Sequence, residues 1–326
     1  MLNPLPAMPK SRSVAAADPT LRACVQAAAD ALERAQLSYG HGTTNAFDEA
    51  AWLVLWQLGL PLDTDLDACP DAADTLQPRR VNATEQAAID ALIAQRIQTR
   101  KPAAYLTREA WLQGVSFYVD ERCIVPRSLI AEVLVEGSLD YWLDDTAHRV
   151  LDLCTGGGSL AILAAMVYPH VFVHASDISA DALAVARINI ERHGLHQRIS
   201  LHQGDGLPDN GVRFDLILCN PPYVDTQAMR TLPPEFQAEP ALALDGNRAG
   251  ASDGMDFIRQ IIPAAVNCLR DDGILVLEVG HNRAAFEAAF PTLEVFWQAT
   301  SAGDDQVLLV TRAALQALAD RAGATA

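Results

Sequence analysis

Long apolar runs are missing from this 326-residue sequence. No uninterrupted apolar stretch reaches the roughly 18 to 20 residues that span a bilayer, so we expect no transmembrane helix. Among the first twenty residues two basic side chains occur, but Pro4, Pro6 and Pro9 interrupt the stretch and no apolar segment follows. We therefore expect residues 1–20 to form a disordered tail rather than a secretory signal, and the protein to be cytoplasmic.

The sequence also has few basic residues relative to acidic ones, and it has no closely spaced cysteine pair. The 24 Lys and Arg residues are outnumbered by 41 Asp and Glu residues, which gives a formal net charge of −17. Because nucleic-acid affinity comes largely from basic side chains that neutralise phosphates, we expect a basic protein as partner and no direct nucleic-acid binding. The six cysteines are far apart, with no C-x-x-C pair and no histidine at zinc-ligand spacing. This pattern predicts reduced thiols and no metal site.

The length suits a catalytic domain with a smaller companion. Hydrophobic periodicity predicts helices over residues 21–37, 47–58 and 85–100, and Asn82 followed by Glu85 is a start signal for the third helix. We therefore expect a helical domain over residues 21–104. Alternating apolar residues and a turn at Gln113-Gly114 then predict a linking β-hairpin over residues 105–128, ahead of a domain over residues 129–326.

Short apolar strands alternate with helices from about Arg149 onward. The strands are expected at residues 150–153, 171–175, 199–202, 214–219, 274–279, 293–299 and 307–311. Such alternation predicts a parallel sheet covered by helices on both faces, and the last two strands read as an antiparallel hairpin. The fold class is thus α/β, with a doubly wound, seven-stranded, Rossmann-like domain.

A glycine-rich loop, DLCTGGGS at residues 152–159, follows the first of these strands. Glycines let the backbone turn sharply and approach a ligand closely. Gly156, Gly158 and Ala161 also satisfy the dinucleotide fingerprint G-x-G-x-x-A, and Asp177 lies about 20 residues on, where that fingerprint expects a ribose-binding carboxylate. An oxidoreductase that uses a nicotinamide cofactor is therefore one alternative.

Three carboxylates at the ends of successive strands favour S-adenosylmethionine instead. Asp152, directly before the glycines, would repel a pyrophosphate but attract the ammonium and sulfonium charges of S-adenosylmethionine. Asp177 can accept both ribose hydroxyls, although helix capping by Asp177 or Ser179 accounts for it equally well. Asp205 can accept from the adenine amino group, and an ordinary turn aspartate is the alternative.

The sequence Asn220-Pro221-Pro222-Tyr223 directly follows the fourth strand. A strand-ending turn explains these residues if they are taken alone. However, the carboxyl end of a strand beside the glycine loop is where open α/β sheets bind ligands. Methyl transfer to a planar nitrogen requires acceptors for both N–H groups, which the Asn220 side chain and the Pro221 carbonyl can supply, while Tyr223 offers a flat face. This turn therefore favours methylation of an amide or aromatic amine.

With these motifs the sequence resembles the HemK-like protein-glutamine N5-methyltransferases. The match runs from about Tyr105 to Arg312 and includes Glu278-Val279-Gly280 in the family's order. The resemblance implies a class I methyltransferase domain, S-adenosylmethionine as cofactor and a helical N-terminal domain that recognises the protein substrate. It implies these cofactor-contacting residues: Asp152, Thr155, Gly156, Gly157, Gly158, Asp177, Ile178, Asp205, Gly206 and Asn220. It also implies that Asn220, Pro221, Pro222 and Tyr223 are the catalytic residues that hold the substrate glutamine.

Two branches of this family act on peptide-chain release factors and on ribosomal protein L-three. The stretches VPRS at 125–128, LPPEF at 232–236, EPALAL at 239–244 and SDGMD at 252–256 resemble the ribosomal branch, whereas Gln237-Ala238 departs from it. We therefore expect methylation of a glutamine side chain of ribosomal protein L-three. The alternatives are release factors, adenine-N6 methylation of nucleic acid through a similar turn, and a subunit that binds the cofactor without catalysis.

Arg127 has two interpretations from the sequence. Its guanidinium can pair with a carboxylate of the substrate or cofactor, or it can be a surface charge.

Overall fold

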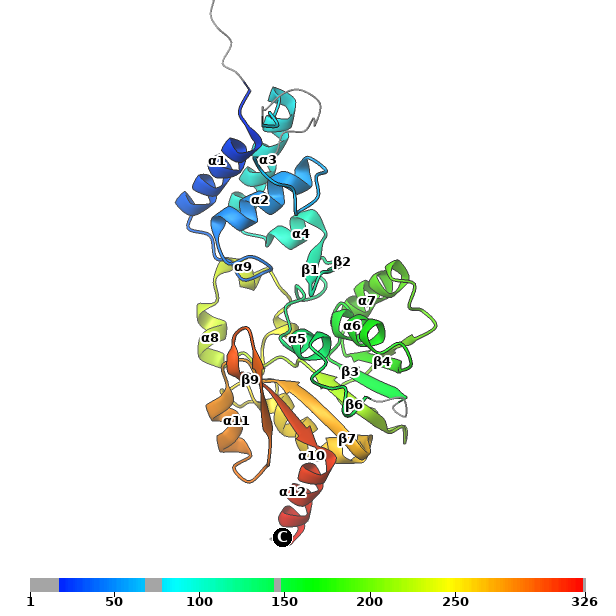
Figure 1. The fold of residues 1–326 in the computed structure, drawn as a ribbon. Helices are drawn as coiled ribbons and strands as arrows, with labels where there is room; N and C mark the ends of the chain where they lie inside the picture. Colours follow the sequence, from blue (N-terminus) through cyan, green and yellow to red (C-terminus); the bar gives the residue numbers. More distant parts are fainter. Residues whose placement is uncertain (1–17, 68–77, 144–147, 325–326) are drawn as a thin grey trace, which may run out of the picture. The chain divides into compact units, whose positions relative to one another are not determined.

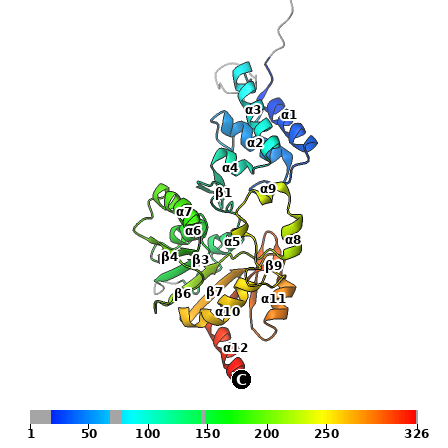
Figure 2. The ribbon, with the colours of Figure 1, turned by 180° about the vertical axis from the view of Figure 1, so that it is seen from behind.

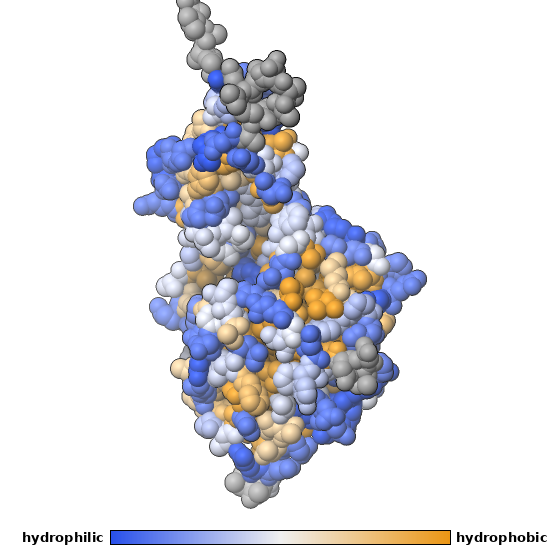
Figure 3. All heavy atoms as spheres, viewed as in Figure 1, coloured by the Kyte–Doolittle hydropathy of each residue, from blue (hydrophilic) through white to orange (hydrophobic). Residues whose placement is uncertain are grey.

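The computed structural model describes residues 18–67, 78–143 and 148–324. The chain divides into a smaller unit, which holds Ala46–Ile97 and the described residues up to Gln36, and a larger unit, which holds Leu37–Asn45 and the chain from Gln98 onward. The predicted tail lies outside the described residues except for residues 18–20. No helix among the described residues is long and apolar enough to cross a membrane. On the face seen in Figure 3, hydrophilic residues are widespread in both units.

The smaller unit contains the three predicted helices: α1 (Leu21–Arg34), α2 (Ala46–Gln57) and α3 (Ala83–Thr99). They are coloured blue to cyan in Figure 1. The predicted start of α3 is confirmed, because Asn82 Oδ1 accepts from the backbone N–H of Glu85 at 3.0 Å while the Glu85 carboxylate accepts from the Asn82 N–H at 3.0 Å. This reciprocal pair is a capping box. The core of the unit also holds a buried ion pair between Arg96 and Glu49 at 2.9 Å.

A seven-stranded sheet forms the centre of the larger unit. Its strands are β3 (Arg149–Leu153), β4 (Phe172–Asp177), β5 (Ile199–Gln203), β6 (Phe214–Cys219), β7 (Leu269–Glu278), β8 (Phe296–Thr300) and β9 (Gly303–Thr311). Their order is β5-β4-β3-β6-β7-β9-β8; the first five are parallel, and β9 is antiparallel to both of its neighbours. The predicted doubly wound fold is confirmed. Strand order reverses at β3, which is where such sheets bind ligands.

Helices cover both faces of this sheet, as Figures 1 and 2 show from opposite sides. One face packs against α5 (Ile130–Val135), α6 (Ser159–Val167) and part of α7 (Ala180–Arg192). The other face packs against α10 (Asp256–Cys268), α11 (Arg283–Ala289) and α12 (Arg312–Ala324). Alternate strand residues serve the two faces: Val150 faces the α6 side, while Leu151 and Leu153 face the α10 side.

The predicted hairpin is present but shorter than expected. Strands β1 (Ala110–Leu112) and β2 (Val115–Phe117) pair across a turn in which Gln113 and Gly114 have φ of 50° and 74°. Residues 103–107 form the short helix α4 (Ala103–Thr107), and residues 118–128 are not a strand. The reason is that no other strand pairs with residues 118–128. Their polar groups are satisfied by side chains instead, as when Val125 N–H donates to Glu239 Oε1 at 2.9 Å.

An insertion between β6 and α10 contains the remaining helical turns. These are α8 (Thr226–Thr231), α9 (Pro234–Gln237) and the 3₁₀ turn η1 (Ala241–Ala243). The insertion is tied to the end of β6 by an isolated bridge between Val224 and Asp245. This connection places α9 and η1 beside the carboxyl edge of the sheet.

Candidate active site

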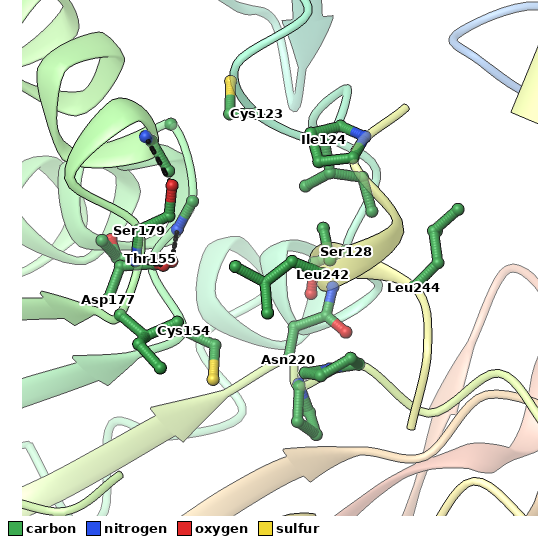
Figure 4. A pocket seen from close by; sticks show the side chains of 18 of the residues that line it. Cys123, Ile124, Ser128, Cys154, Thr155, Asp177, Ser179, Asn220, Leu242 and Leu244 are labelled. Atoms are coloured by element: carbon green, nitrogen blue, oxygen red, sulfur yellow. Dashed lines mark hydrogen bonds between the residues drawn. The ribbon is translucent and has the colours of Figure 1, made fainter. Parts of the chain in front are cut away.

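A cavity of about 280 Å³ lies in the larger unit at the carboxyl ends of β3, β4 and β6. Four groups of residues line it: the 122–128 segment; the glycine loop with the ends of β4 and β5; the 220–224 turn; and residues of the insertion such as Phe236, Leu242 and Leu244. Figure 4 shows Asp177 and Thr155 on one side of this cavity and Asn220 with Leu242 and Leu244 on the other. The expected cofactor motif and the expected substrate motif therefore share one cavity.

The glycine loop combines two backbone requirements. Gly156 and Gly157 line the cavity, and Gly156 has a positive φ of 55°. Gly158 has φ of 83°, and a Cβ placed there would lie 3.1 Å from the Cβ of Ala186 on α7. Gly156 and Gly157 thus present backbone to a ligand, whereas Gly158 allows α6 to begin close against α7.

Asp152 lies behind the loop, with none of its surface exposed. Its Oδ2 accepts from Thr155 Oγ1 at 2.5 Å and from the Ala161 N–H at 2.9 Å, but Oδ1 has no hydrogen-bond partner among the described residues. Burial raises the pKa of Asp152 to about 7, against the lowering effect of those two hydrogen bonds. A buried acceptor without a partner is costly and favours a cation or donor nearby.

Asp177 ends β4 and lines the cavity. Its Oδ2 accepts from the Gly156 N–H at 2.9 Å, and its Oδ1 accepts from the Ser179 N–H at 2.8 Å. The hydroxyl of Ser179 in turn caps α7 by accepting from the Ala182 N–H at 3.1 Å. Burial raises the pKa of Asp177, although the backbone donors act in the opposite direction. Asp177 therefore braces the glycine loop while each oxygen keeps capacity for a hydroxyl donor.

Asp205 is more exposed than the other two carboxylates. Its side chain is 55% exposed and lies 3.3 Å from Arg248 of the insertion. Ile178 and Gly206, which flank the same part of the cavity, also line it. This edge thus offers an acidic group and an apolar wall.

Asn220 projects from the end of β6 into the cavity (Figure 4). Within the described part of the chain its side-chain amide has no hydrogen-bond partner. The turn itself is held firmly, because the Tyr223 hydroxyl donates to Glu278 Oε1 at 3.1 Å and the Tyr223 carbonyl accepts from Asn282 Nδ2 at 2.5 Å. A rigid turn with a free amide is suited to receive a polar, planar group.

Arg127 fits neither of the two interpretations drawn from the sequence. It forms a two-pronged ion pair with Glu239, with Nη1 to Oε1 at 2.7 Å and Nη2 to Oε2 at 2.8 Å, and its guanidinium lies 5.7 Å from the ring centre of Phe236. Its partner is therefore a buried carboxylate of the same chain. The pair links the 122–128 segment to the insertion.

Two further features were missed by sequence reasoning. Cys154 is half-buried, lines the cavity and has φ of 61°. The buried carboxylates Glu239 and Glu278 each join two walls of the cavity. Both residues belong to stretches that carry the family resemblance, but neither was given a role: Glu278 lies near the end of a predicted strand, and Glu239 lies in an irregular segment without periodicity.

The methyltransferase small domain family model matches residues 132–246, which include the glycine loop and the 220–223 turn. Together with the doubly wound sheet and the cavity at its carboxyl edge, this match defines the class: an S-adenosylmethionine-dependent methyltransferase. The alternative of a nicotinamide-dependent oxidoreductase is thereby set aside.

Curated relatives narrow this class to one family. The chain is 49% identical over 309 residues to a ribosomal protein uL3 glutamine methyltransferase of Burkholderia pseudomallei, covering 92% of this chain and 97% of that protein. It is 48% identical to the protein of the same name from Bordetella pertussis, over 90% of this chain and 95% of that one. The corresponding Neisseria meningitidis protein is 44% identical, over 90% and 93% of the two chains. The chain belongs to the family of ribosomal protein uL3 glutamine methyltransferases.

Proposed function

We propose that this protein transfers a methyl group from S-adenosylmethionine to the side-chain amide nitrogen of a glutamine in ribosomal protein uL3. The observation that carries the proposal is the free amide of Asn220, which faces the same cavity as the glycine loop and Asp177. The chain's membership of the family supports the choice of acceptor.

The residues of the cofactor side fit S-adenosylmethionine. When bound, this cofactor supplies a methyl group attached to a positively charged sulfur. Asp177 would accept from the ribose hydroxyls, and Asp205 with Ile178 and Gly206 would contact the adenine end. Asp152 has no exposed surface, so it would act on the cofactor through the electric field of its carboxylate. Its Oδ1 is buried without a hydrogen-bond partner among the described residues, and the negative carboxylate favours positive charge at the glycine loop.

The 220–223 turn would hold the substrate amide. An amide nitrogen delocalises its lone pair, so attack requires that the nitrogen be aimed at the methyl carbon and that both of its N–H groups have acceptors. The Asn220 side-chain oxygen and the Pro221 carbonyl supply these acceptors, and the proline rings keep them rigid. In the overall transfer the amide nitrogen would gain a bond to the methyl carbon while the sulfur–methyl bond breaks and leaves its electron pair on the sulfur, and one N–H proton would pass to water. Tyr223 would provide the flat face beside the amide.

The acceptor panel distinguishes the proposed substrate from its alternatives. Labelled S-adenosylmethionine is incubated with purified uL3, with a release factor, and with RNA and DNA in parallel. We expect label on uL3. Label on the release factor alone would keep the chemistry and overturn the acceptor, whereas label on nucleic acid alone would show that the turn serves adenine methylation. No transfer to any acceptor, with cofactor still bound, would point to a binding subunit.

Recognition of the protein substrate by the helical unit, and a cytoplasmic site of action, remain part of this proposal. The substrate is a ribosomal protein in the named relatives, and the strongly acidic chain suits a basic acceptor.

A further inference from the structure

One buried carboxylate outside the cavity wall contacts residues from two of its walls. Glu278, the last residue of β7, is 4% exposed. Its Oε2 accepts from Ser128 Oγ at 2.6 Å and from the Leu129 N–H at 2.9 Å. Its Oε1 accepts from the Tyr223 hydroxyl at 3.1 Å. Ser128 and Tyr223 both line the cavity, whereas the residues lining it do not include Glu278.

The sheet register explains how one residue reaches both walls. Cys219 of β6 pairs with Leu277 of β7, so the next residues along, Asn220 and Glu278, leave the same edge side by side. Two residues further on, Gly280 has φ of 55°, and a Cβ there would lie 2.4 Å from Cε2 of Tyr223. The end of β7 therefore holds the Tyr223 ring by its face and its hydroxyl by hydrogen bond.

We infer that Glu278 is a positioning residue that fixes the separation of the 220–223 turn from the 122–128 segment and thereby the width of the slot for the substrate amide. This inference rests on the proposed function, because it assigns the slot to a planar amide. Glu278 does not touch the reacting atoms in this account. It acts through Ser128 and Tyr223.

Loss of the hydrogen bonds to Glu278 should lower the rate of the reaction without weakening cofactor binding. A planar amide is methylated only while its nitrogen stays aligned with the methyl group, and a misplacement of about 1 Å can cost roughly 100-fold in rate. Apart from Asn220, the residues proposed to contact the cofactor lie at the ends of β3, β4 and β5, which β6 separates from β7. Loosening the Glu278 links should therefore lower kcat and leave cofactor affinity unchanged.

Substitution of Glu278 tests these links. We expect Glu278→Ala to lower kcat about 100-fold. Glu278→Gln should restore most of the rate, because its Oε1 can accept from Ser128 and Leu129 while its amide nitrogen donates to the Tyr223 oxygen. Glu287→Ala on the exposed face of α11 is the matched control and should retain the wild-type kcat.

Hydrogen exchange provides a readout that does not depend on the acceptor. Backbone amides of residues 124, 125, 127–129 and 223–224 should exchange faster in Glu278→Ala and at the wild-type rate in Glu278→Gln. Unchanged exchange in Glu278→Ala, or equal loss of kcat in the Ala and Gln variants, would overturn the inference. Weaker cofactor binding in step with kcat would assign Glu278 a general structural role instead.

A double-mutant cycle covers the case in which Glu278→Ala fails to fold. Ser128→Ala and Tyr223→Phe each remove one donor to Glu278, and we expect their effects on kcat to be non-additive. Additive effects would show that the two walls are not joined through Glu278. If the wild-type enzyme methylates no glutamine yet the exchange pattern appears as expected, the proposed function fails while the structural link stands.

Discussion

The buried oxygen Oδ1 of Asp152 indicates the charge of the ligand expected at the glycine loop. Leaving a buried acceptor without a partner costs about 1–3 kcal/mol, so such an atom persists where it serves a role. Oδ1 of Asp152 is such an atom among the described residues, and it lies behind the loop expected to receive a cation. We therefore expect the charge of this carboxylate to be coupled to the charge of the cofactor.

Cofactor affinity is expected to depend on pH through Asp152. Burial raises the pKa of Asp152 to about 7, and positive charge on the cofactor favours the ionised form. Below that pKa the group must lose a proton on binding, so affinity should weaken by up to about tenfold per pH unit as pH falls. Calorimetry on both sides of neutrality measures this dependence and the released proton. Asp152→Asn should remove it, and a wild-type pH dependence in that variant would refute the assignment.

Substitution of Asn220 is expected to change the rate of methyl transfer and not the affinity for the cofactor. Asn220→Ala should lower methyl transfer by about 100-fold or more while cofactor affinity stays near the wild-type value, because its amide serves the substrate. Asn267→Ala, on an exposed position of α10, is the control for a lost asparagine. Kinetics and cofactor calorimetry on both variants test the division of roles. Equal loss of activity and cofactor binding in Asn220→Ala would argue against it.

Several elements meet at Glu239, which is buried between the 122–128 segment and the insertion. It pairs with Arg127, and His41 of the Leu37–Asn45 segment lies 3.3 Å from its Oε2. The His41 ring also packs on Phe236 of α9, with ring centres 4.3 Å apart. Three stretches far apart in the sequence are thus fastened together within the larger unit.

This cluster predicts the acid sensitivity of the larger unit. Burial acts to raise the pKa of Glu239, but the interactions with His41 and Arg127 outweigh it and lower the pKa from 4.5 to about 2. A lowered acid pKa stabilises the fold above the unfolded-state value, and that contribution is lost as pH falls from about 4.5 towards 2. Chemical denaturation across this range should show the stability gap between wild type and Glu239→Gln closing with acid. A gap independent of pH would contradict the pKa assignment.

The sequence was informative wherever the signal is local. Helices α1 to α3 and the strands of the sheet were predicted because period and capping are written into neighbouring residues, as at Asn82 and Glu85. Asn220 directly follows β6 and Asp177 ends β4, and both line the cavity, as expected from strands that end at one sheet edge. Motif and topology thus placed these two residues at one cavity, while their roles stay predictions.

Contacts between distant residues were beyond local reasoning. Arg127 and Glu239 are 112 positions apart, and neither is part of a periodic pattern that would reveal the other. The alternation of Val115, Phe117 and Val119 ahead of the apolar residues 123–125 extended the predicted hairpin to residue 128, yet no strand pairs with residues 118–128 in the fold. Alternation of apolar and polar residues indicates which side chains are buried, whereas a strand also requires a neighbouring strand with which to form hydrogen bonds.

At the scale of the whole molecule, net charge shapes encounter with the acceptor. A net charge of −17 should attract a basic protein. At physiological ionic strength, salt screens this attraction beyond a distance of about 8–10 Å. We therefore expect KM for uL3 to rise with ionic strength while kcat stays constant. Steady-state kinetics over a salt series provide the measurement, with a short neutral glutamine-containing peptide as control. A salt-independent KM for uL3 would contradict steering by charge.

The most direct measurement of the central claim is mass mapping of uL3 after incubation with the purified enzyme and S-adenosylmethionine. We expect the mass increment of one methyl group on a glutamine side chain, present with the wild-type enzyme and absent with Asn220→Ala. A methyl group on any other residue type, or one that persists undiminished with Asn220→Ala, would contradict it.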